Sequence, residues 1–446
     1  MPGVQRVGPV TAAGAAGPSE PPGPPARRTA RQGEFLAGDG IRGIGMVCII
    51  MAHLLGGALV LDGVFSEGFR GAYGELPGII GSGFQLGLPM FFVLSGYLIS
   101  RPWVRAYVLD RRTPSARRYI RSRVLRIVPV FWLIGGLMLF QYGSHGASLL
   151  DLTEIFGFAQ IYHETAASLF IGQAWTIDVE VAFYVFVPIG AWLLTVGTRR
   201  VIALTGRSLS RRERVAVLVS LLAVATVASA YVRGTTAPGA GLNESLPATF
   251  YYFGPGVALA ALELEFTGPL ARARLRRLAP FFGLSAAAIA VGLSVAESHD
   301  TFALIRTRGA LAVAAGAGLA LGALLARQLG RGDSPRWVDN RLTRWLGARS
   351  YPCYLLQSAS IATAVAVIGR VGGGPWIELL VLTAFVVPVT IAFGAVVHAT
   401  IERPLLTWGH GQRHRTAVPR AEGPAEPAPL DQRVLAPVIA TRVDAP

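Results

Sequence analysis

The chain has 446 residues, of which 52% are hydrophobic and only 15% charged, and its formal net charge is +15. A soluble enzyme of this size would carry more charge between its core segments. The apolar residues fall into blocks of about 20, the length that a helix needs to cross a bilayer. The basic residues lie in the short segments between these blocks, where membrane topology explains them, so we expect no nucleic-acid partner. The composition predicts an all-α, polytopic bundle of transmembrane helices.

Both ends of the chain differ in composition from the middle. Residues 1–34 are rich in Pro, Gly and Ala and lack the continuous apolar stretch of a secretory signal. Residues 410–446 are polar and Pro-rich, and too short to bury a core. We therefore predict two disordered cytoplasmic tails that flank one transmembrane domain, residues 35–409, with no second soluble domain.

About ten apolar spans follow one another through the predicted domain. They are placed at 43–61, 78–100, 124–142, 175–197, 215–232, 246–264, 279–296, 309–326, 345–368 and 376–399. Arginines recur in both tails and in the loops after every second span, whereas the loop at 143–174 has none. Apart from Arg306 and Arg308 in the seventh loop, this asymmetry follows the enrichment of cytoplasmic loops in basic residues. It predicts that both termini are cytoplasmic.

A histidine, His53, interrupts the first apolar span eleven residues after Arg42. Eleven helical steps leave the two side chains about 20° apart in azimuth and about 16 Å apart along the axis. One long, thin ligand such as coenzyme A can contact both. Asp39, about 21 Å from His53, is too distant to orient it. Ionisable groups at this depth mark function by default, although His53 can also simply hydrogen-bond a neighbouring helix.

Two carboxylates, Asp178 and Glu180, enter the fourth span close to its start at Trp175. They lie within about 8 Å of that start, so one interpretation is that they reach interfacial water. The functional interpretation is that Glu180 raises the basicity of His53 and fixes its tautomer.

Arg123 and Arg126 lie three residues apart at the start of the third span. At this spacing they share a helical face and form a fork for phosphate oxygens. The enrichment of cytoplasmic segments in arginine predicts the same residues without any ligand.

Other reactive residue types show no site spacing. The two cysteines, Cys48 and Cys353, lie inside apolar blocks, and we expect no metal centre. Ser95 and Gly96 are predicted to permit close helix packing.

These residues resemble the membrane-bound acyltransferase family 3, whose members transfer acyl groups to hydroxyls of sugars, cell-envelope polymers and antibiotics. The N-terminal signature matches Asp39 to Gly43 with Arg42 and, after ten intervening residues, His53. The later motifs cover the chain to residue 404 in the family's order: Phe91 to Ile99, Arg123 to Pro129, Trp175 to Tyr184, Leu346 to Leu355, and Glu402 to Pro404.

The resemblance implies a bacterial inner-membrane O-acyltransferase with acyl-CoA as donor substrate and no permanently bound cofactor. It implies that Arg42, Arg123 and Arg126 gather the donor's phosphates. His53 would be the general base or would accept the acyl group itself, and Glu180 would support it. The acceptor would be a hydroxyl of a glycan, glycolipid or macrolide-like secondary metabolite. Supporting roles fall to Asp39, Asp178, Ser350, Tyr351, Gln357 and Glu402.

Two positions depart from the family pattern. Gln357 stands where a histidine is often found, and an amide cannot act as a base near neutral pH; Asp178 stands where a serine is common. A transporter or flippase with an intramembrane proton relay is one alternative, and it would move substrate without a covalent product. A catalytically inactive scaffold is the other. The oligomeric state is not predicted.

Overall fold

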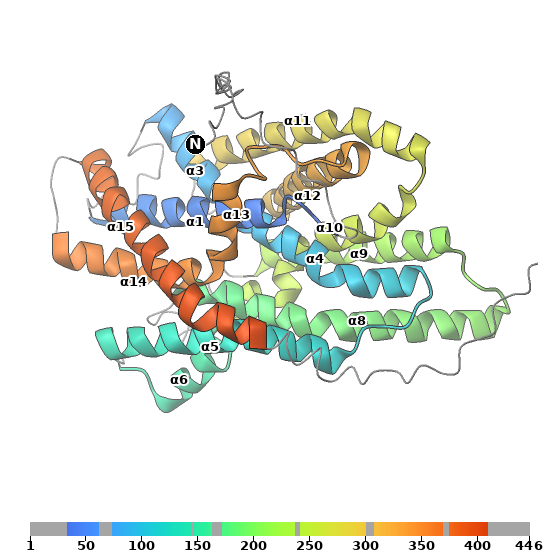
Figure 1. Ribbon diagram of the computed structural model, residues 1–446, viewed down its shortest axis with the longest axis horizontal. Helices are drawn as coiled ribbons and strands as arrows, with labels where there is room; N and C mark the ends of the chain where they lie inside the picture. Colours follow the sequence, from blue (N-terminus) through green and yellow to red (C-terminus); the bar gives the residue numbers. More distant parts are fainter. Residues whose placement is uncertain are drawn as a thin grey trace, which may run out of the picture.

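The computed structural model describes residues 34–61, 74–143, 146–162, 172–236, 241–299, 307–368 and 374–408. Both predicted tails lie outside these ranges, except for Glu34. Arg306 also lies outside them. The regular elements within them are all helical (Figure 1), which confirms the predicted all-α class. The α-helices are α1 (Gly38–Leu61), α3 (Glu75–Phe84), α4 (Gly87–Val108), α5 (Ala116–Tyr142), α6 (Leu149–Phe156), α8 (Trp175–Thr205), α9 (Arg211–Thr235), α10 (Leu246–Leu262), α11 (Pro269–His299), α12 (Thr307–Arg331), α13 (Arg341–Ala348), α14 (Ser350–Ile368) and α15 (Pro375–Val397).

Short helical turns complete the described part of the chain. They are η2 (Gln160–Tyr162), η3 (Gly172–Ala174), η4 (Gly241–Glu244) and η5 (Glu263–Glu265), together with the π-helix η7 (His398–Glu402).

Nine helices of the described ranges are long and apolar enough to cross a membrane. The remaining predicted span, 246–264, forms α10, whose 17 residues extend about 26 Å. This is slightly less than the hydrocarbon thickness of about 30 Å. Because α10 packs against α4, α9 and α12 and buries most of its side chains, protein rather than lipid surrounds it. The chain is thus a multi-pass membrane protein.

Two predicted spans are broken in the structure. The span at 78–100 separates into α3 and α4 around Gln85 and Leu86, within a stretch that contains Gly81, Gly83 and Gly87. Glycine has a low helix propensity, which explains the break. The span at 345–368 is interrupted at Arg349, between α13 and α14.

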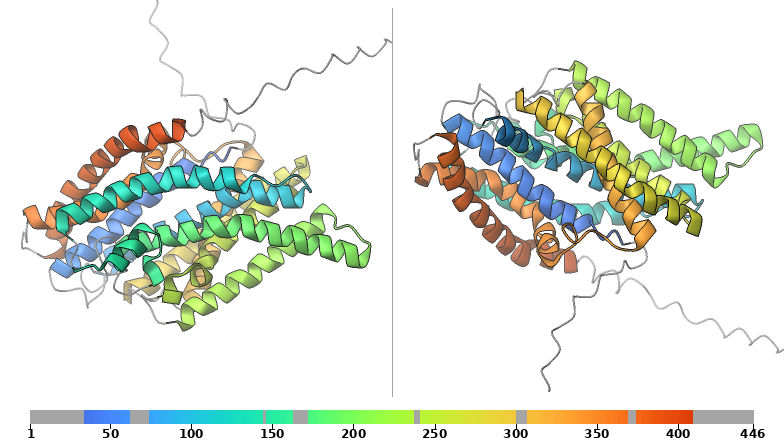
Figure 2. Two further views of the ribbon diagram at one scale, coloured as in Figure 1. Left: turned by 90° about the horizontal axis from the view of Figure 1, so that it is seen from below. Right: turned by 90° about the horizontal axis from the view of Figure 1, so that it is seen from above.

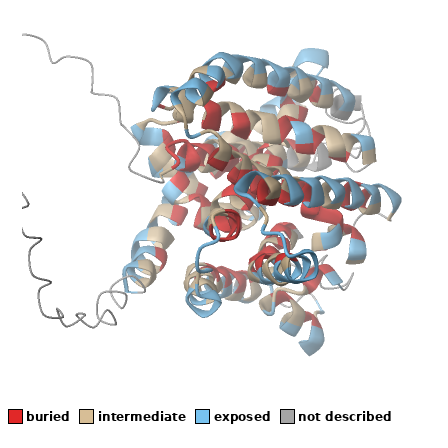
Figure 3. Ribbon diagram, turned by 90° about the vertical axis from the view of Figure 1, so that its right-hand side faces the viewer, coloured by how far each residue is buried: buried red, intermediate tan, exposed pale blue. Residues whose placement is uncertain are grey.

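Helix α1 lies inside the bundle, where it packs against α4, α13, α14 and α15 (Figure 2). Helices α11 and α12 form an antiparallel pair, and α8 and α9 extend past the other helices at one end of the molecule (Figure 1). Buried residues gather between the helices, and exposed ones lie on the outer faces (Figure 3). Large apolar side chains such as Phe140, Trp192 and Phe393 are among the exposed ones, as expected of surfaces that face lipid.

Helices α4 and α10 approach most closely at two glycines. A Cβ atom added to Gly96 would overlap the carbonyl oxygen of Phe253, and one added to Gly256 would overlap that of Val93. Small residues allow this approach of two backbones in membrane proteins. The contact fixes the position of α4.

A buried carboxylate that the sequence did not single out also joins these helices. Glu263, in η5, pairs with Arg101 through an Nε–Oε1 contact of 3.1 Å and with Arg105 at 3.5 Å. The hydroxyl of Tyr97 donates a hydrogen bond to its other oxygen. Removal of one member of such a buried group would leave an uncompensated charge.

Candidate active site

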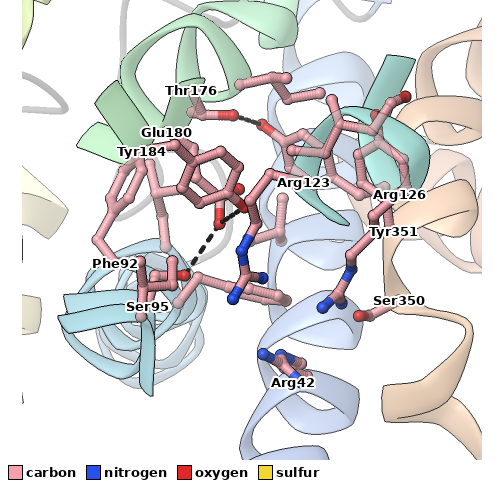
Figure 4. Close-up of a pocket in the computed structure, with 17 residues that line it drawn as sticks. Arg42, Phe92, Ser95, Arg123, Arg126, Thr176, Glu180, Tyr184, Ser350 and Tyr351 are labelled. Carbon is pink, nitrogen blue, oxygen red and sulfur yellow. Dashed lines mark hydrogen bonds between the residues drawn. The ribbon is translucent and has the colours of Figure 1, made fainter. Parts of the chain in front are cut away.

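One cavity of about 80 Å³ is enclosed by five helices, α1, α4, α5, α8 and α14. Six residues that the sequence predicts as functional line it: Arg42, Arg123, Arg126, Glu180, Ser350 and Tyr351. Four further polar residues, Ser95, Thr176, Tyr184 and Tyr354, complete the polar lining. The structure therefore brings most of the predicted site together (Figure 4).

Three guanidinium groups, from α1 and α5, point into this cavity (Figure 4). Arg42 is paired through Nη1 with Asp39 Oδ1 at 3.5 Å, and the Asp39 side chain is 53% exposed. The Arg123 guanidinium lies over the rings of Tyr119 and Tyr184, 5.5 and 5.3 Å from their centroids. Among the described residues, no carboxylate lies within 4.0 Å of the side-chain nitrogens of Arg123 or Arg126.

The charges of the cavity lining do not balance. Three arginines face a single carboxylate, Glu180. Arginine is costly inside a membrane protein unless it is paired; because Asp39 pairs with Arg42 from outside the lining, one positive charge remains in excess, which favours an anionic ligand. The planar guanidinium group binds phosphate oxygens with two parallel hydrogen bonds.

Glu180 is held by two hydroxyl groups, and both donate to its Oε1. The distances are 3.1 Å from Ser95 Oγ and 2.7 Å from Tyr184 Oη. Ser95, predicted only as a packing residue, thus belongs to the site, while the adjacent Gly96 makes the close helix contact.

His53 lies on the face of α1 that carries Arg42 and Ile49. Ile49 lines the cavity, whereas His53 follows one turn later, outside the lining, and its side chain is exposed. The His53 Nδ1 lies 2.9 Å from the carbonyl oxygen of Ile49. Because a carbonyl only accepts, Nδ1 carries the proton, and Nε2 of the neutral ring keeps its lone pair. The backbone, not Glu180 as expected, therefore fixes the tautomer.

Ser350 and Tyr351 begin α14 beside the cavity. The Tyr351 hydroxyl donates to the carbonyl oxygen of Ile127 at 2.9 Å, which ties α14 to α5, and Ser350 Oγ donates to that of Gly347 at 2.9 Å. Gln357 follows on the same helix and is fully buried, close to the His53 ring. Neither polar atom of its side chain has a hydrogen-bond partner in the described part of the chain.

Asp178 lies away from this cavity. Its side chain is buried, and Oδ2 accepts a hydrogen bond from the backbone N–H of Ile161 at 3.4 Å. Glu244 is near it, and burial raises the pKa of the Glu244 carboxyl above its usual value while Arg233 opposes that shift. Asp178 thus anchors the segment that precedes α8.

Glu402 is also outside the cavity lining. Its Oε2 lies 2.8 Å from Nδ1 of His398, one turn earlier, within the π-helix. The predicted supporting residues are therefore dispersed: Ser350 and Tyr351 border the cavity, and Asp39 contacts it through Arg42.

A polar network missed in the sequence holds α14 against the start of α8. Thr176 Oγ1 lies 2.7 Å from the Tyr354 hydroxyl, which donates to the carbonyl oxygen of Gln173 at 2.9 Å. Ser358 Oγ donates to Gln173 Oε1 at 2.6 Å. Thr176 and Tyr354 lie inside the two motifs that resemble the family, which was the only available signal.

A multi-pass helix bundle around an arginine-lined cavity defines a class: integral membrane proteins with a cationic cavity inside the bundle. The profile of the acyltransferase domain of acyltransferase family 3 matches residues 36–395. The chain belongs to this family, which confirms the resemblance, and its domain is an acyltransferase domain.

One relative adds a biological context. A stretch of 105 residues is 33% identical to the exopolysaccharide production protein ExoZ of Rhizobium meliloti (strain 1021). The aligned part covers 22% of this chain and 31% of ExoZ, so the chain matches about a third of that relative's length. No solved structure matches the chain significantly.

Proposed function

We propose that the protein is an O-acyltransferase of the inner membrane that moves an acyl group from acyl-CoA to a hydroxyl group of a cell-envelope glycan, a glycolipid or a secondary metabolite. The observation that carries this proposal is the convergence of Arg42, Arg123 and Arg126 on one cavity that holds a single carboxylate. The phosphates of coenzyme A supply the matching negative charge.

In this proposal, the donor runs along the face of α1 that carries Arg42, Ile49 and His53. With the phosphates at Arg42, a thin pantetheine arm that follows Ile49 reaches His53, about 16 Å along the helix axis. The acceptor hydroxyl approaches at His53, whose side chain is exposed.

The free Nε2 of His53 suits two mechanisms. As a general base it takes the proton of the acceptor hydroxyl while the hydroxyl oxygen attacks the thioester carbon; the C–O bond forms, the C–S bond breaks, and the thiolate of coenzyme A takes the proton from the imidazolium. As a nucleophile, Nε2 attacks the thioester carbon, the C–S bond breaks, and the thiolate of coenzyme A leaves. The acceptor hydroxyl oxygen then attacks the acyl carbon, the C–N bond breaks, and the hydroxyl proton passes through the freed Nε2 to the thiolate. In both, Glu180 and its two hydroxyl partners shape the arginine-lined wall.

A polysaccharide is the acceptor that the relative favours, because ExoZ is named for exopolysaccharide production. Mass spectrometry of polysaccharide and secondary-metabolite fractions from cells with and without the gene should show one acyl mass that is lost with the gene. A lost mass in the metabolite fraction alone would reassign the acceptor.

The activity itself can be tested with purified protein in nanodiscs. We expect His53→Ala to abolish acyl transfer, measured as release of the coenzyme A thiol, while coenzyme A binding by calorimetry stays within about twofold, since the arginines remain. Cys48→Ala, on the opposite face of α1, is the matched control and should keep both. Transfer by His53→Ala at the wild-type rate would refute the role of His53, and substrate flux without a covalent product would favour the transporter.

A further inference from the structure

A surface beside the start of α1 combines arginines with exposed aromatic and aliphatic side chains. It is formed by α13 and the residues just before it: Arg336, Trp337, Arg341, Leu342 and Trp345, hereafter the α13 face. Trp337 is 68% exposed, Leu342 64% and Trp345 40%.

The opposite side of the same segment is packed. Val338, Thr343 and Gly347 are buried, and a Cβ atom added to Gly347 would overlap the backbone carbonyl of Asp39. An Asn340 capping box with Thr343 starts α13, so the helix is well defined and its orientation is fixed against α1. The α13 face is therefore a fixed outward surface.

The two arginines of this face have no carboxylate partner among the residues that the structure describes. In the described ranges, no carboxylate lies within 4.0 Å of Arg336 or Arg341, whereas the neighbouring Arg344 is paired with Asp339 at 2.6 Å. The face thus offers two free positive charges next to three large apolar side chains.

This combination has a specific physical meaning in a membrane protein. Tryptophan and arginine together are enriched at the level of the lipid headgroups, where an aromatic ring reaches the acyl boundary and a guanidinium group binds phosphate. Trp337 also borders an apolar groove of about 520 Å³ with Ile41 and Ile44 of α1, so the aromatic side of the face continues into an apolar surface.

We propose that the α13 face binds the anionic headgroups of the surrounding bilayer as an interfacial helix, with Arg336 and Arg341 on lipid phosphates and Trp337, Leu342 and Trp345 in the acyl boundary. An arginine near an anionic membrane surface is attracted to it electrostatically. Because α13 packs directly on the Asp39–Arg42 segment, the lipid contact also steadies the arginine end of the cavity.

The depth of the face is tested by fluorescence. The full chain and its Trp337→Phe/Trp345→Phe variant are placed in nanodiscs with and without brominated phospholipid, and their difference spectrum isolates the emission of the two tryptophans. We expect this emission to be quenched by brominated lipid and protected from iodide in the water. Quenching by iodide but not by brominated lipid would overturn the proposal.

The charge preference is tested by thermal unfolding in nanodiscs of phosphatidylcholine alone and with about one third phosphatidylglycerol. The wild type should unfold at a higher temperature with the anionic lipid, and Arg336→Gln/Arg341→Gln should lose most of that gain. Arg199→Gln/Arg200→Gln, which removes the same charge from the exposed far end of α8, should keep it. An equal gain in wild type and the Arg336→Gln/Arg341→Gln variant would overturn the proposal, whatever the enzyme's activity.

Discussion

Arg126 lines the cavity without a carboxylate partner in the described structure. By contrast, the Arg123 guanidinium stacks over two tyrosine rings, and Arg42 forms an ion pair with Asp39. An unpaired guanidinium group inside a membrane bundle lowers stability unless a ligand compensates it. Arg126 is therefore the residue whose replacement best separates binding from folding.

We expect Arg126→Gln to weaken coenzyme A binding by about tenfold to a hundredfold, since a hydrogen bond from a charged group contributes about 1.5–3 kcal/mol. The unfolding temperature should stay the same or rise, because an unpaired charge is removed. Arg121→Gln, exposed on the same helix, is the control and should bind normally. Calorimetry and thermal unfolding of both variants give the answer, and unchanged affinity in Arg126→Gln would contradict a phosphate role.

At this scale the sequence predicted part of the cavity lining, but not all of the lining residues and not their hydrogen-bond partners. Helical spacing, a local property, predicted that Arg123 and Arg126 share a face. That Arg42 joins them was implied by the resemblance to the family. The predicted pairing of Glu180 with His53 was wrong. Ser95 and Tyr184 donate hydrogen bonds to Glu180, and His53 bonds to the backbone carbonyl of Ile49. A partner depends on which helices become neighbours, and hydropathy does not contain that information.

Hydropathy predicted the membrane-spanning helices but not the positions at which two of them are interrupted. Apolar blocks define spans because the bilayer requires a minimum length. The breaks at Gln85–Leu86 and Arg349 depend on local turns and caps, and the short α10 is permitted only because other helices shield it.

The contact between α4 and α10 gives a prediction at the level of elements. We expect Gly96→Ala to lower the unfolding temperature and the transfer rate together, because the added methyl group overlaps the backbone of Phe253 and displaces Ser95 from Glu180. Gly136→Ala, in α5 with open space around it, is the matched control. It should be neutral or raise stability by about 0.5–1 kcal/mol, since glycine destabilises helix interiors. Equal stability of the two variants would contradict the prediction, because it would mean that α4 and α10 can move apart without loss of stability.

For the molecule as a whole, family membership and the helical bundle are established, and the orientation of the termini stays a prediction. It depends on α10: ten crossings leave both ends on one side, and nine leave them on opposite sides. Arginine asymmetry favours the cytoplasm for both.

Fusion reporters test this orientation. Green fluorescent protein should fluoresce and alkaline phosphatase should stay inactive at either terminus, because both ends are predicted to be cytoplasmic. Active phosphatase at the C-terminus alone would mean that α10 does not cross the membrane.

The cavity draws its walls from α1 near one end of the described chain and from α14 near the other. During synthesis, the arginines of α1 and α5 are in place long before α14 delivers Ser350, Tyr351 and Tyr354. A partly made chain therefore has an open, incomplete pocket that lacks the wall formed by α14. We therefore expect the cavity to be complete only when insertion is nearly finished.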